Sequence, residues 1–255
     1  MPPPNGLAIL LGAGPETGTG IARILSSPKY GNLAVALLSR TKDNLLAVKQ
    51  TVQKSNPDAC IEVFPTDTAP ENLTKAFAAI KAHSSFSGLK LRVAIYSVKH
   101  GGKKDFLAET HAEFTKSIDA YVGGAMTFAQ EVLRRLFADH GEKDLTSGGG
   151  KKGTLIFTGT LAAVRTTTAQ YAAYSAGRAA VRLLAQGLAK DYSAKGVHVV
   201  HAVANGKIED KNDEDQKTGL YMSADAVGKE YWHLCEQEPA LWTHELDMRP
   251  AQEKF

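Results

Sequence analysis

Residues 7–25, LAILLGAGPETGTGIARIL, decide the fold of this chain. The first six of them, LAILLG (7–12), form an unbroken apolar run with the length of a buried strand. A glycine-rich turn follows, and residues 18–26 have the apolar spacing of a helix. A buried strand that passes through a glycine turn into a helix is typical of the opening unit of a parallel α/β sheet.

The glycines of this turn suit a phosphate-binding loop. Gly14, Gly18 and Gly20 have a GxxxGxG spacing, and Gly12 can instead be the first glycine of the motif, so the register stays open. Glycine permits a tight turn and close approach of the backbone to a pyrophosphate, and the helix N-terminus adds free N–H groups. A mobile turn is the alternative, but the position between strand and helix favours dinucleotide binding. The predicted contacts here are Gly12, Gly14, Thr17, Gly18, Gly20 and Ile21.

Strand-like and helix-like segments alternate along the rest of the chain. Strands are predicted at 33–39, 61–65, 91–97, 153–160 and 196–204. Helices are predicted at 41–53, 71–83, 111–138, 170–193 and 223–237. Continuous apolar strands separated by amphipathic helices predict a parallel sheet with helices on both faces. Thr68 and Glu71 have the spacing of a capping box, and the segment 141–153, GEKDLTSGGGKKG, is typical of a flexible surface loop.

The composition excludes several functional classes. The 43% apolar and 22% charged fractions are ordinary for a globular protein, and the net charge of +3, with lysines spread along the chain, argues against a nucleic-acid partner. The two cysteines, Cys60 and Cys235, suggest no metal site or redox pair, so we expect a cytoplasmic protein. The run LAILLGAG is too short to span a bilayer and MPPPNG lacks a signal-peptide layout, so no membrane partner is expected.

The end of the second predicted strand indicates which dinucleotide binds. A carboxylate there binds the ribose 2′-hydroxyl of NAD, whereas a cation suits the 2′-phosphate of NADP. The sequence Ser39-Arg40-Thr41 has no acid, so Arg40 favours NADP(H), with a solvated charge as the alternative. Asp67, after the third strand, is predicted to contact adenine or, with equal weight, to act as a turn or cap acid beside Thr68. Arg40, Asp67 and Thr68 are all candidate cofactor contacts.

Tyr174 and Arg178 lie four residues apart in the helix-like run AAYSAGRAAVRLLAQGLAKDY, which follows GTLIFTGT. With the glycine loop, Arg40 and Asp67 in the same order, the chain resembles the short-chain dehydrogenase/reductase family over nearly its whole length. The resemblance is to a divergent subgroup with IFTG, VHVVHAVANG and a tail like WTHELDMRP. It implies a single-domain Rossmann fold over residues 1–255, with a doubly wound parallel sheet of about seven strands and helices on both faces.

The resemblance also implies catalytic roles. In the family a tyrosine is the general acid/base, a lysine four residues later binds the nicotinamide ribose and lowers the pKa of the tyrosine, and a serine orients the carbonyl. Tyr174 matches the tyrosine, but Arg178 occupies the lysine position, giving Tyr-x-x-x-Arg. Thr160 is the best match to the serine, although Leu161 matches by strict counting. The family's relay asparagine, on the long fourth helix, corresponds to Tyr121.

Other family segments are also replaced. The NAG segment after the fourth strand is Ser97-Val98-Lys99-His100-Gly101 here, and the Pro-Gly after the sixth strand is Asn205-Gly206. The resemblance places Ser97, Tyr174, Arg178, Gly206 and Ile208 among the cofactor contacts, with Ile208 as the backbone contact of the nicotinamide amide. The segment 207–227 corresponds to the family's substrate lid, and its dense charge predicts mobility.

The exchange of lysine for arginine bears on the chemistry. Arg178 supplies a permanent cation that favours a phenolate, but arginine cannot act as a deprotonating relay and its fork is wider than an ammonium group. A phenol can still donate a proton to a carbonyl, so reduction should be less impaired than oxidation, which needs a base. The sequence therefore predicts an NADP(H)-dependent oxidoreductase that reduces a carbonyl, imine or conjugated double bond of a small organic molecule. Tyr174 is its proton donor, assisted by Arg178 and Thr160.

Two other functions stay open. The replaced lysine, asparagine and NAG positions are consistent with a cofactor-binding but non-redox relative, an isomerase or cyclase, and a binding protein that senses NADP(H) is the third possibility. In the family, the 111–138 and 170–190 helices build homodimers and homotetramers. The apolar faces of these helices can equally be intramolecular core.

Overall fold

The uninterrupted apolar runs of the sequence become buried strands in the computed structural model, which describes residues 3–165 and 168–253. Seven parallel strands form one sheet in the order β3-β2-β1-β4-β5-β6-β7. They are β1 (Leu7–Leu11), β2 (Ala34–Ser39), β3 (Ile61–Pro65), β4 (Leu91–Tyr96), β5 (Gly153–Gly159), β6 (Val197–Ala204) and β7 (Glu245–Met248). The strand order reverses between β1 and β4, which is where sheets of this type bind ligands.

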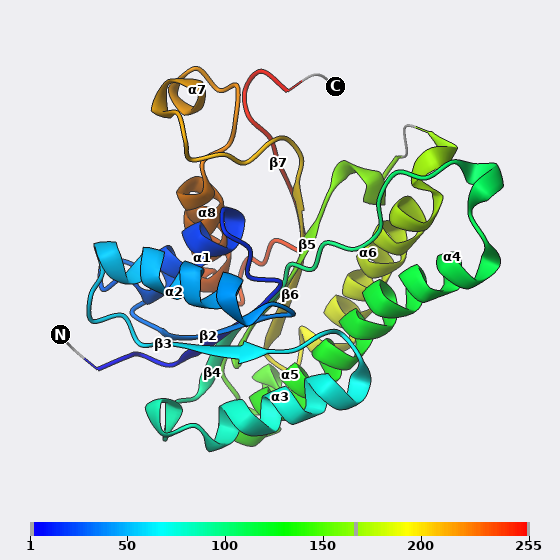
Figure 1. Ribbon diagram of the computed structural model, residues 1–255. Helices are drawn as coiled ribbons and strands as arrows, with labels where there is room; N and C mark the ends of the chain where they lie inside the picture. Colours follow the sequence, from blue (N-terminus) through cyan, green and yellow to red (C-terminus); the bar gives the residue numbers. More distant parts are fainter. Residues whose placement is uncertain (1–2, 166–167, 254–255) are drawn as a thin grey trace.

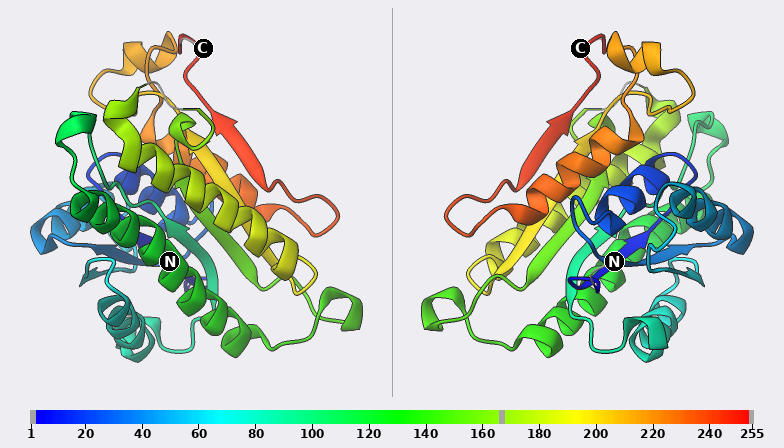
Figure 2. Two further views of the ribbon diagram at one scale, coloured as in Figure 1. Left: turned by 90° about the vertical axis from the view of Figure 1, so that its right-hand side faces the viewer. Right: turned by 90° about the vertical axis from the view of Figure 1, so that its left-hand side faces the viewer.

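Helices cover both faces of the sheet (Figures 1 and 2). One face carries α1 (Thr17–Ser26), α2 (Lys42–Ser55) and α8 (Ala224–Glu236). The other side carries α3 (Pro70–Ala82), α4 (His111–Ile118), α5 (Gly124–His140) and α6 (Ala172–Tyr192). The short helix α7 (Asp213–Lys217) lies near the C-terminal segment, beyond the sheet (Figure 1).

The sheet divides the apolar core into two clusters. Ile21, Val48 and Tyr231 pack on one face, and Phe128 and Val181 pack on the other. Strand β1 is buried along its whole length, as expected for a central strand covered on both sides. The predicted α/β fold, with a parallel sheet and helices on both faces, is confirmed.

Two elements have features that the residue pattern did not indicate. Strand β7 lies at the edge of the sheet, and its side chains alternate between exposed and half-buried, so it lacks an apolar run. The helix predicted at 111–138 extends to His140 and contains a π-helical turn, Asp119–Gly123, between α4 and α5. Such turns insert an extra residue into a helix and are frequent at functional sites.

Helix α3 begins differently from the prediction. Ala69 is its N-cap residue and no side chain caps it, so the capping box predicted for Thr68 and Glu71 is wrong. Asp67 organises the turn instead, because its Oδ1 accepts hydrogen bonds from the Ala69 N–H at 3.0 Å and the Asn72 side chain at 2.9 Å. Both hydrogen bonds lower the pKa of Asp67, and the bond from Asn72 has the larger effect.

The segment 141–153, predicted as a flexible surface loop, holds a buried lysine. Lys152 is 3% exposed, and its ammonium group donates to the carbonyl oxygens of Lys143 and Lys195 at 2.7 and 2.6 Å. Lys151 donates to two carbonyl oxygens at the end of α8, at 2.7 and 2.6 Å. Carbonyl groups at helix C-termini lack intrahelical partners, so Lys151 anchors the segment to the end of α8. Lys152 joins the segment to Lys195, in the turn that follows α6.

Helices α1 and α8 cross closely at two glycines. A Cβ atom on Gly20 would lie 2.3 Å from the backbone of Ala224, and one on Gly228 would lie 2.8 Å from the carbonyl oxygen of Gly20. Helix packing therefore requires a small residue at Gly20, whether or not a ligand binds the loop before it.

We expect Gly20→Ala to lower the free energy of unfolding by about 1–3 kcal/mol, because the new methyl group overlaps backbone atoms of α8. The matched control is Gly187→Ala in α6, where an added Cβ meets nothing within 4 Å. This control should gain roughly 0.5–1 kcal/mol from lower backbone entropy in the unfolded chain. Urea unfolding measures both variants, and a Gly20→Ala protein as stable as the control would contradict the close crossing.

Candidate active site

A cavity of about 460 Å³ lies at the carboxyl ends of β1 to β4. Gly12 and Gly14 line it from the glycine loop, Arg40 lines it after β2, and Asp67 and Thr68 line it after β3. The structure thus brings together five of the residues that the sequence proposes as cofactor contacts. These residues lie where the strand order reverses, and sheets of this kind bind a dinucleotide at that point.

The glycines of the loop differ in what surrounds them. Gly12 has a φ of 91°, and a Cβ there would lie 2.3 Å from the carbonyl oxygen of Ser97, where the chain leaves β4. A Cβ on Gly18 would lie 2.8 Å from the backbone of Ala13. An added Cβ on Gly14 meets nothing within 4 Å. Gly12 and Gly18 therefore permit close backbone contacts, and Gly14 leaves its backbone open to a ligand.

The first turn of α1 supplies backbone donors. Thr17 is the first residue of the helix, and the early N–H groups of any helix have no intrahelical acceptor. The Thr19 hydroxyl donates to the carbonyl oxygen of Pro15 at 2.6 Å, which ties the loop to this turn. The Ile21 side chain is fully buried, so this residue can offer a cofactor only its backbone.

Tyr174 lies in the first turn of α6 and reaches the end of β5. Its hydroxyl oxygen is 3.3 Å from the hydroxyl oxygen of Thr160, within hydrogen-bond distance. Leu161, the strict-count match to the family serine, begins a 3-10 turn and carries no hydroxyl. The loop after β4 also contacts Tyr174, because a Cβ on Gly101 would lie 3.5 Å from it. The structure thus brings together the two hydroxyl groups that the sequence singles out.

The guanidinium group of Arg178 is buried beside Tyr174. Only 4% of Arg178 is exposed, and its Nη1 and Nη2 donate to the carbonyl oxygens of Thr158 at 2.9 Å and Val98 at 3.2 Å. Its Cζ lies 5.0 Å from the ring centre of Tyr174 and 4.6 Å from that of Tyr121. The cation is therefore held by two aromatic rings and two carbonyl groups, which are partners that a guanidinium prefers. Val98 also lines the 460 Å³ cavity, so Arg178 connects the two parts of the site.

These two hydrogen bonds leave Arg178 some capacity for further contacts. A guanidinium has five N–H donors, and the bonds to Thr158 and Val98 use two of them. The position of the charge is fixed by the backbone, so it acts on its surroundings as a permanent positive field. Such a field favours the charged form of a nearby phenol.

Tyr121 lies on the π-helical turn and packs on Arg178. Its hydroxyl is buried and has no hydrogen-bond partner among the described residues. Burial raises its pKa to about 12, although the nearby Arg178 charge opposes this shift. The Tyr96 hydroxyl donates to the Tyr121 carbonyl oxygen at 2.8 Å, and a Cβ on Gly177 would lie 3.0 Å from the Tyr121 ring. Tyr121 is therefore a neutral ring, fixed from two sides, that supports the guanidinium.

Sequence reasoning did not single out Thr158 or Val98. Thr158 accepts from Arg178 through its carbonyl oxygen, and its hydroxyl is 2.8 Å from that of Tyr231. Both residues hold Arg178 through the backbone, which every residue carries. No side-chain pattern in the sequence could have indicated this role.

Ile208 lies at the start of the segment predicted as a lid, and Gly206 directly precedes that segment. Ile208 forms a parallel bridge with Met222, and the backbone N–H of Gln252, in the C-terminal tail, donates to a lid carbonyl at 2.9 Å. The last four residues of the predicted lid, 224–227, belong to α8, where Ala224 and Val227 are buried. The mobility of this segment stays a prediction.

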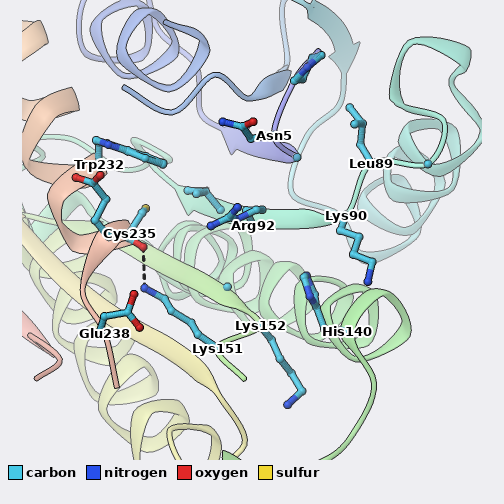
Figure 3. Close-up of a pocket in the computed structure, with 16 residues that line it drawn as sticks. Asn5, Leu89, Lys90, Arg92, His140, Lys151, Lys152, Trp232, Cys235 and Glu238 are labelled. Carbon is cyan, nitrogen blue, oxygen red and sulfur yellow. Dashed lines mark hydrogen bonds between the residues drawn. The ribbon is translucent and has the colours of Figure 1, made fainter. Parts of the chain in front are cut away.

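A larger cavity, of about 800 Å³, lies at the opposite edge of the sheet, where β1, β4 and β5 begin (Figure 3). Arg92, Lys151 and Lys152 contribute cations to it. The two lysines already bind backbone carbonyl oxygens, as the bond from Lys151 to Cys235 in Figure 3 illustrates. None of the proposed catalytic or cofactor residues lines this cavity, so we place the candidate active site at the carboxyl edge of the sheet.

Within residues 3–165 and 168–253, no helix is long and apolar enough to cross a membrane. The same part of the chain contains no group of three or more His, Cys, Asp and Glu side chains placed to hold a metal ion.

Comparisons with known proteins agree with the fold described above. A model of the short chain dehydrogenase family matches residues 7–219. A short-chain dehydrogenase from Rhodopseudomonas palustris is 23% identical, with a TM-score of 0.77 over 97% of this chain and 100% of that one. An alcohol dehydrogenase from the archaeon Thermococcus sibiricus, complexed with 5-hydroxy-NADP, is 16% identical, with a TM-score of 0.77 over 98% of both chains. A Pseudomonas aeruginosa short chain oxidoreductase, described as containing an atypical catalytic center, is 14% identical, with a TM-score of 0.77 over 98% of both chains. A search of curated protein sequences found no match.

The contact between Tyr121 and Arg178 predicts different effects for two substitutions. Tyr121→Phe removes an unpartnered buried hydroxyl and keeps the ring, so we expect the free energy of unfolding to change by less than about 1 kcal/mol. Tyr121→Ala removes the ring and leaves a cavity under the guanidinium, which should cost about 3–5 kcal/mol. Chemical denaturation of the two variants checks both values, and equal losses would show that the hydroxyl has a partner.

Proposed function

The chain belongs to the short-chain dehydrogenase family, and on this basis we propose that it is an NADP(H)-dependent oxidoreductase. It reduces a carbonyl, imine or conjugated double bond of a small organic molecule. One observation carries the proposal: the Tyr174 hydroxyl lies 3.3 Å from that of Thr160, beside the buried Arg178 guanidinium and next to the cavity of the glycine loop. A proton donor, a hydrogen-bond partner and a cation thus meet at the edge of the cofactor cavity.

Tyr174 is the proton donor in this proposal. A bound nicotinamide supplies the hydride to the electrophilic carbon of the substrate. The Tyr174 hydroxyl donates its proton to the substrate oxygen or nitrogen, and the Thr160 hydroxyl holds that atom by a second hydrogen bond. A positioned donor of this kind typically accelerates a reaction about 10²–10⁴-fold.

Arg178 stabilises the phenolate that remains after proton transfer. Its Cζ is 5.0 Å from the centre of the Tyr174 ring, in a buried environment where charges interact more strongly than in water. The guanidinium keeps its own protons, so it acts by charge and position and not as a link in a proton chain.

The cofactor preference rests on Arg40. Its side chain is exposed at the end of β2, lines the cavity, and has no ion-pair partner among the described residues. A guanidinium with free donors suits a phosphate group. Asp67 already accepts two local hydrogen bonds, which supports its role in the turn before α3 over a role in adenine recognition.

The proposal also includes the oligomeric state of the protein and its cellular compartment. Met126 on α5 and Leu183 on α6 are 49% and 64% exposed, on the two helices that form subunit contacts in the family. We propose a homodimer or homotetramer built on these helices.

Cys60 and Cys235 are free thiols, which fits the reducing environment of the cytoplasm.

A second function is favoured by the contacts of Arg178 and Tyr121. Arg178 is bound to backbone carbonyl oxygens, and Tyr121 occupies the family's relay position with a buried, neutral hydroxyl. A relative that keeps the cofactor cavity without redox turnover, either an isomerase or cyclase or an NADP(H) sensor, would tolerate both features.

Replacement of Tyr174 by phenylalanine tests the redox proposal. With a panel of aldehydes, ketones, quinones, cyclic imines and enones, we expect Tyr174→Phe to slow NADPH oxidation about 10²–10⁴-fold, because the proton donor is lost. NADPH affinity should stay close to that of the wild type. Tyr171→Phe is the matched control, since it removes a neighbouring hydroxyl and keeps the ring that packs against Tyr174, at 6.2 Å between centroids. Wild-type protein that binds NADPH but oxidises it with no member of the panel would favour the second function, and absence of NADPH binding would contradict both.

The exchange Arg178→Lys tests the role of the cation. We expect kcat for alcohol oxidation near neutral pH to rise more than kcat for the reverse reduction, because lysine adds the group that the family uses in its proton relay. The comparison uses kcat because the equilibrium constant fixes the ratio of the two kcat/KM values at any one pH. An equal change of kcat in both directions would overturn this assignment.

A further inference from the structure

We propose that His100 and Lys116 complete, together with Arg40, a binding site for the 2′-phosphate of NADP(H). This inference rests on the proposed use of NADP(H) and deepens it. Sequence reasoning assigns the phosphate to Arg40 alone. The structure adds a side chain from the loop after β4 and another from α4.

The three side chains converge from separate elements on one cavity. Arg40 follows β2, His100 follows β4 and Lys116 lies in α4, and all three line the 460 Å³ space described above. None of the three side chains has a hydrogen-bond or ion-pair partner in the described part of the chain. Their donors are therefore available to a ligand.

Electrostatic coupling supports this convergence. Burial lowers the pKa of His100, and the charges of Arg40 and Lys116 lower it further. Both cations are therefore close enough to the imidazole to oppose its protonation. Like charges gathered in this way cost free energy in the free protein, and a dianionic phosphate among them would convert repulsion into attraction.

When the other charged side chains of the cavity are included, positive charges still outnumber negative ones. Lys99 adds a cation, and Asp67 and Asp119 add the two carboxylates. The Asp67 carboxylate already accepts two hydrogen bonds at the start of α3. The Asp119 carboxylate lies along its own helix, since its Oδ1 would be 3.0 Å from a Cβ on Gly123. Three permanent cations and one histidine thus face two carboxylates, one of which is engaged elsewhere.

The position of the cavity favours the adenosine phosphate over a substrate group. Its lining includes the ends of β2 and β3 but neither Tyr174 nor Thr160, so the reacting centre lies outside it. The phosphate that distinguishes NADP from NAD is carried by the adenosine ribose, which binds at the end of the second strand in such folds.

The arrangement makes binding of the 2′-phosphate depend on pH. A phosphate dianion beside His100 favours the imidazolium form, so NADPH binding takes up a proton that NADH binding does not. Because the second proton of a phosphate monoester leaves near pH ~6, the phosphate stays mostly dianionic above that value. NADPH affinity should therefore rise as pH falls from about 8.5 to about 6.5, with NADH affinity unchanged.

The experiment measures dissociation constants of NADPH and NADH by calorimetry, without a substrate. We expect His100→Asn and Lys116→Met each to lower the preference for NADPH about three- to tenfold, because each removes one charge-assisted contact. Arg40→Ser should lower it further. Lys103→Met is the matched control, because Lys103 is an exposed cation of the same loop that does not line the cavity, and it should keep the preference. The affinity for 2′,5′-ADP, which has no nicotinamide, should change in parallel with that for NADPH.

The outcomes separate this inference from the proposed function. If the wild type binds neither dinucleotide, or binds both equally, the proposed use of NADP(H) fails and this inference fails with it. If the wild type prefers NADPH and Arg40→Ser alone removes the preference, the proposed function stands and the roles of His100 and Lys116 are overturned. Lys116 is exposed on its helix, so Lys116→Met still gives a result if His100→Asn disturbs its loop. If NADPH affinity no longer depends on pH in His100→Asn while NADH affinity is intact, His100 is confirmed as the group that takes up the proton.

Discussion

The candidate site depends on how a buried guanidinium is accommodated without a carboxylate. Removing a charged group from water costs several kcal/mol unless polar partners replace the water. Arg178 is 4% exposed, and no described acid lies within ion-pair distance of it. Two backbone carbonyl oxygens and two aromatic rings stabilise the charge instead. These partners come from the ends of β4 and β5, from α6 and from the π-helical turn, so one side chain fixes four parts of the site relative to one another.

This arrangement explains why the cofactor half and the catalytic half of the site differ in character. The glycine loop, Arg40 and Thr68 surround an open cavity, where backbone groups and exposed cations can receive an anionic ligand. The catalytic half is closely packed, and its single cation is buried between tyrosines. An ammonium group at the same position could not spread its charge over two ring faces and two divergent carbonyl groups in this way, because it lacks the planar fork. The neighbours of Arg178 therefore suit a guanidinium better than an ammonium group.

The sequence allowed most of the fold to be predicted, because strands buried on both faces have continuous apolar runs. Strand β7 is the exception, since an edge strand with alternating half-exposed residues has no such run. At the site, the sequence indicated Tyr174, Arg178 and Thr160 as neighbours, because their side chains and spacing are visible in the sequence. The carbonyl partners of Arg178 were not indicated, because they belong to the backbone. The start of α3 was wrongly predicted because Ala69 is the N-cap residue, and Asp67 organises the turn by accepting from the Ala69 N–H and the Asn72 side chain. The burial of Lys152 was missed because its partners are backbone carbonyl groups of Lys143 and Lys195, which no side-chain pattern indicates.

The π-helical turn has a consequence for how this site can change in evolution. Each residue of an α-helix rotates the chain by about 100°, so a helix that gains or loses one residue turns its two halves relative to each other by that angle. The turn Asp119–Gly123 absorbs one such extra residue between α4 and α5. Deleting a single residue here would let the two helices merge into one regular helix and would rotate Tyr121 out from beneath the guanidinium. A three-nucleotide deletion would thus exchange one set of neighbours of Arg178 for another and would shift Lys116 and Asp119 in the cavity lining, while the sheet keeps its position.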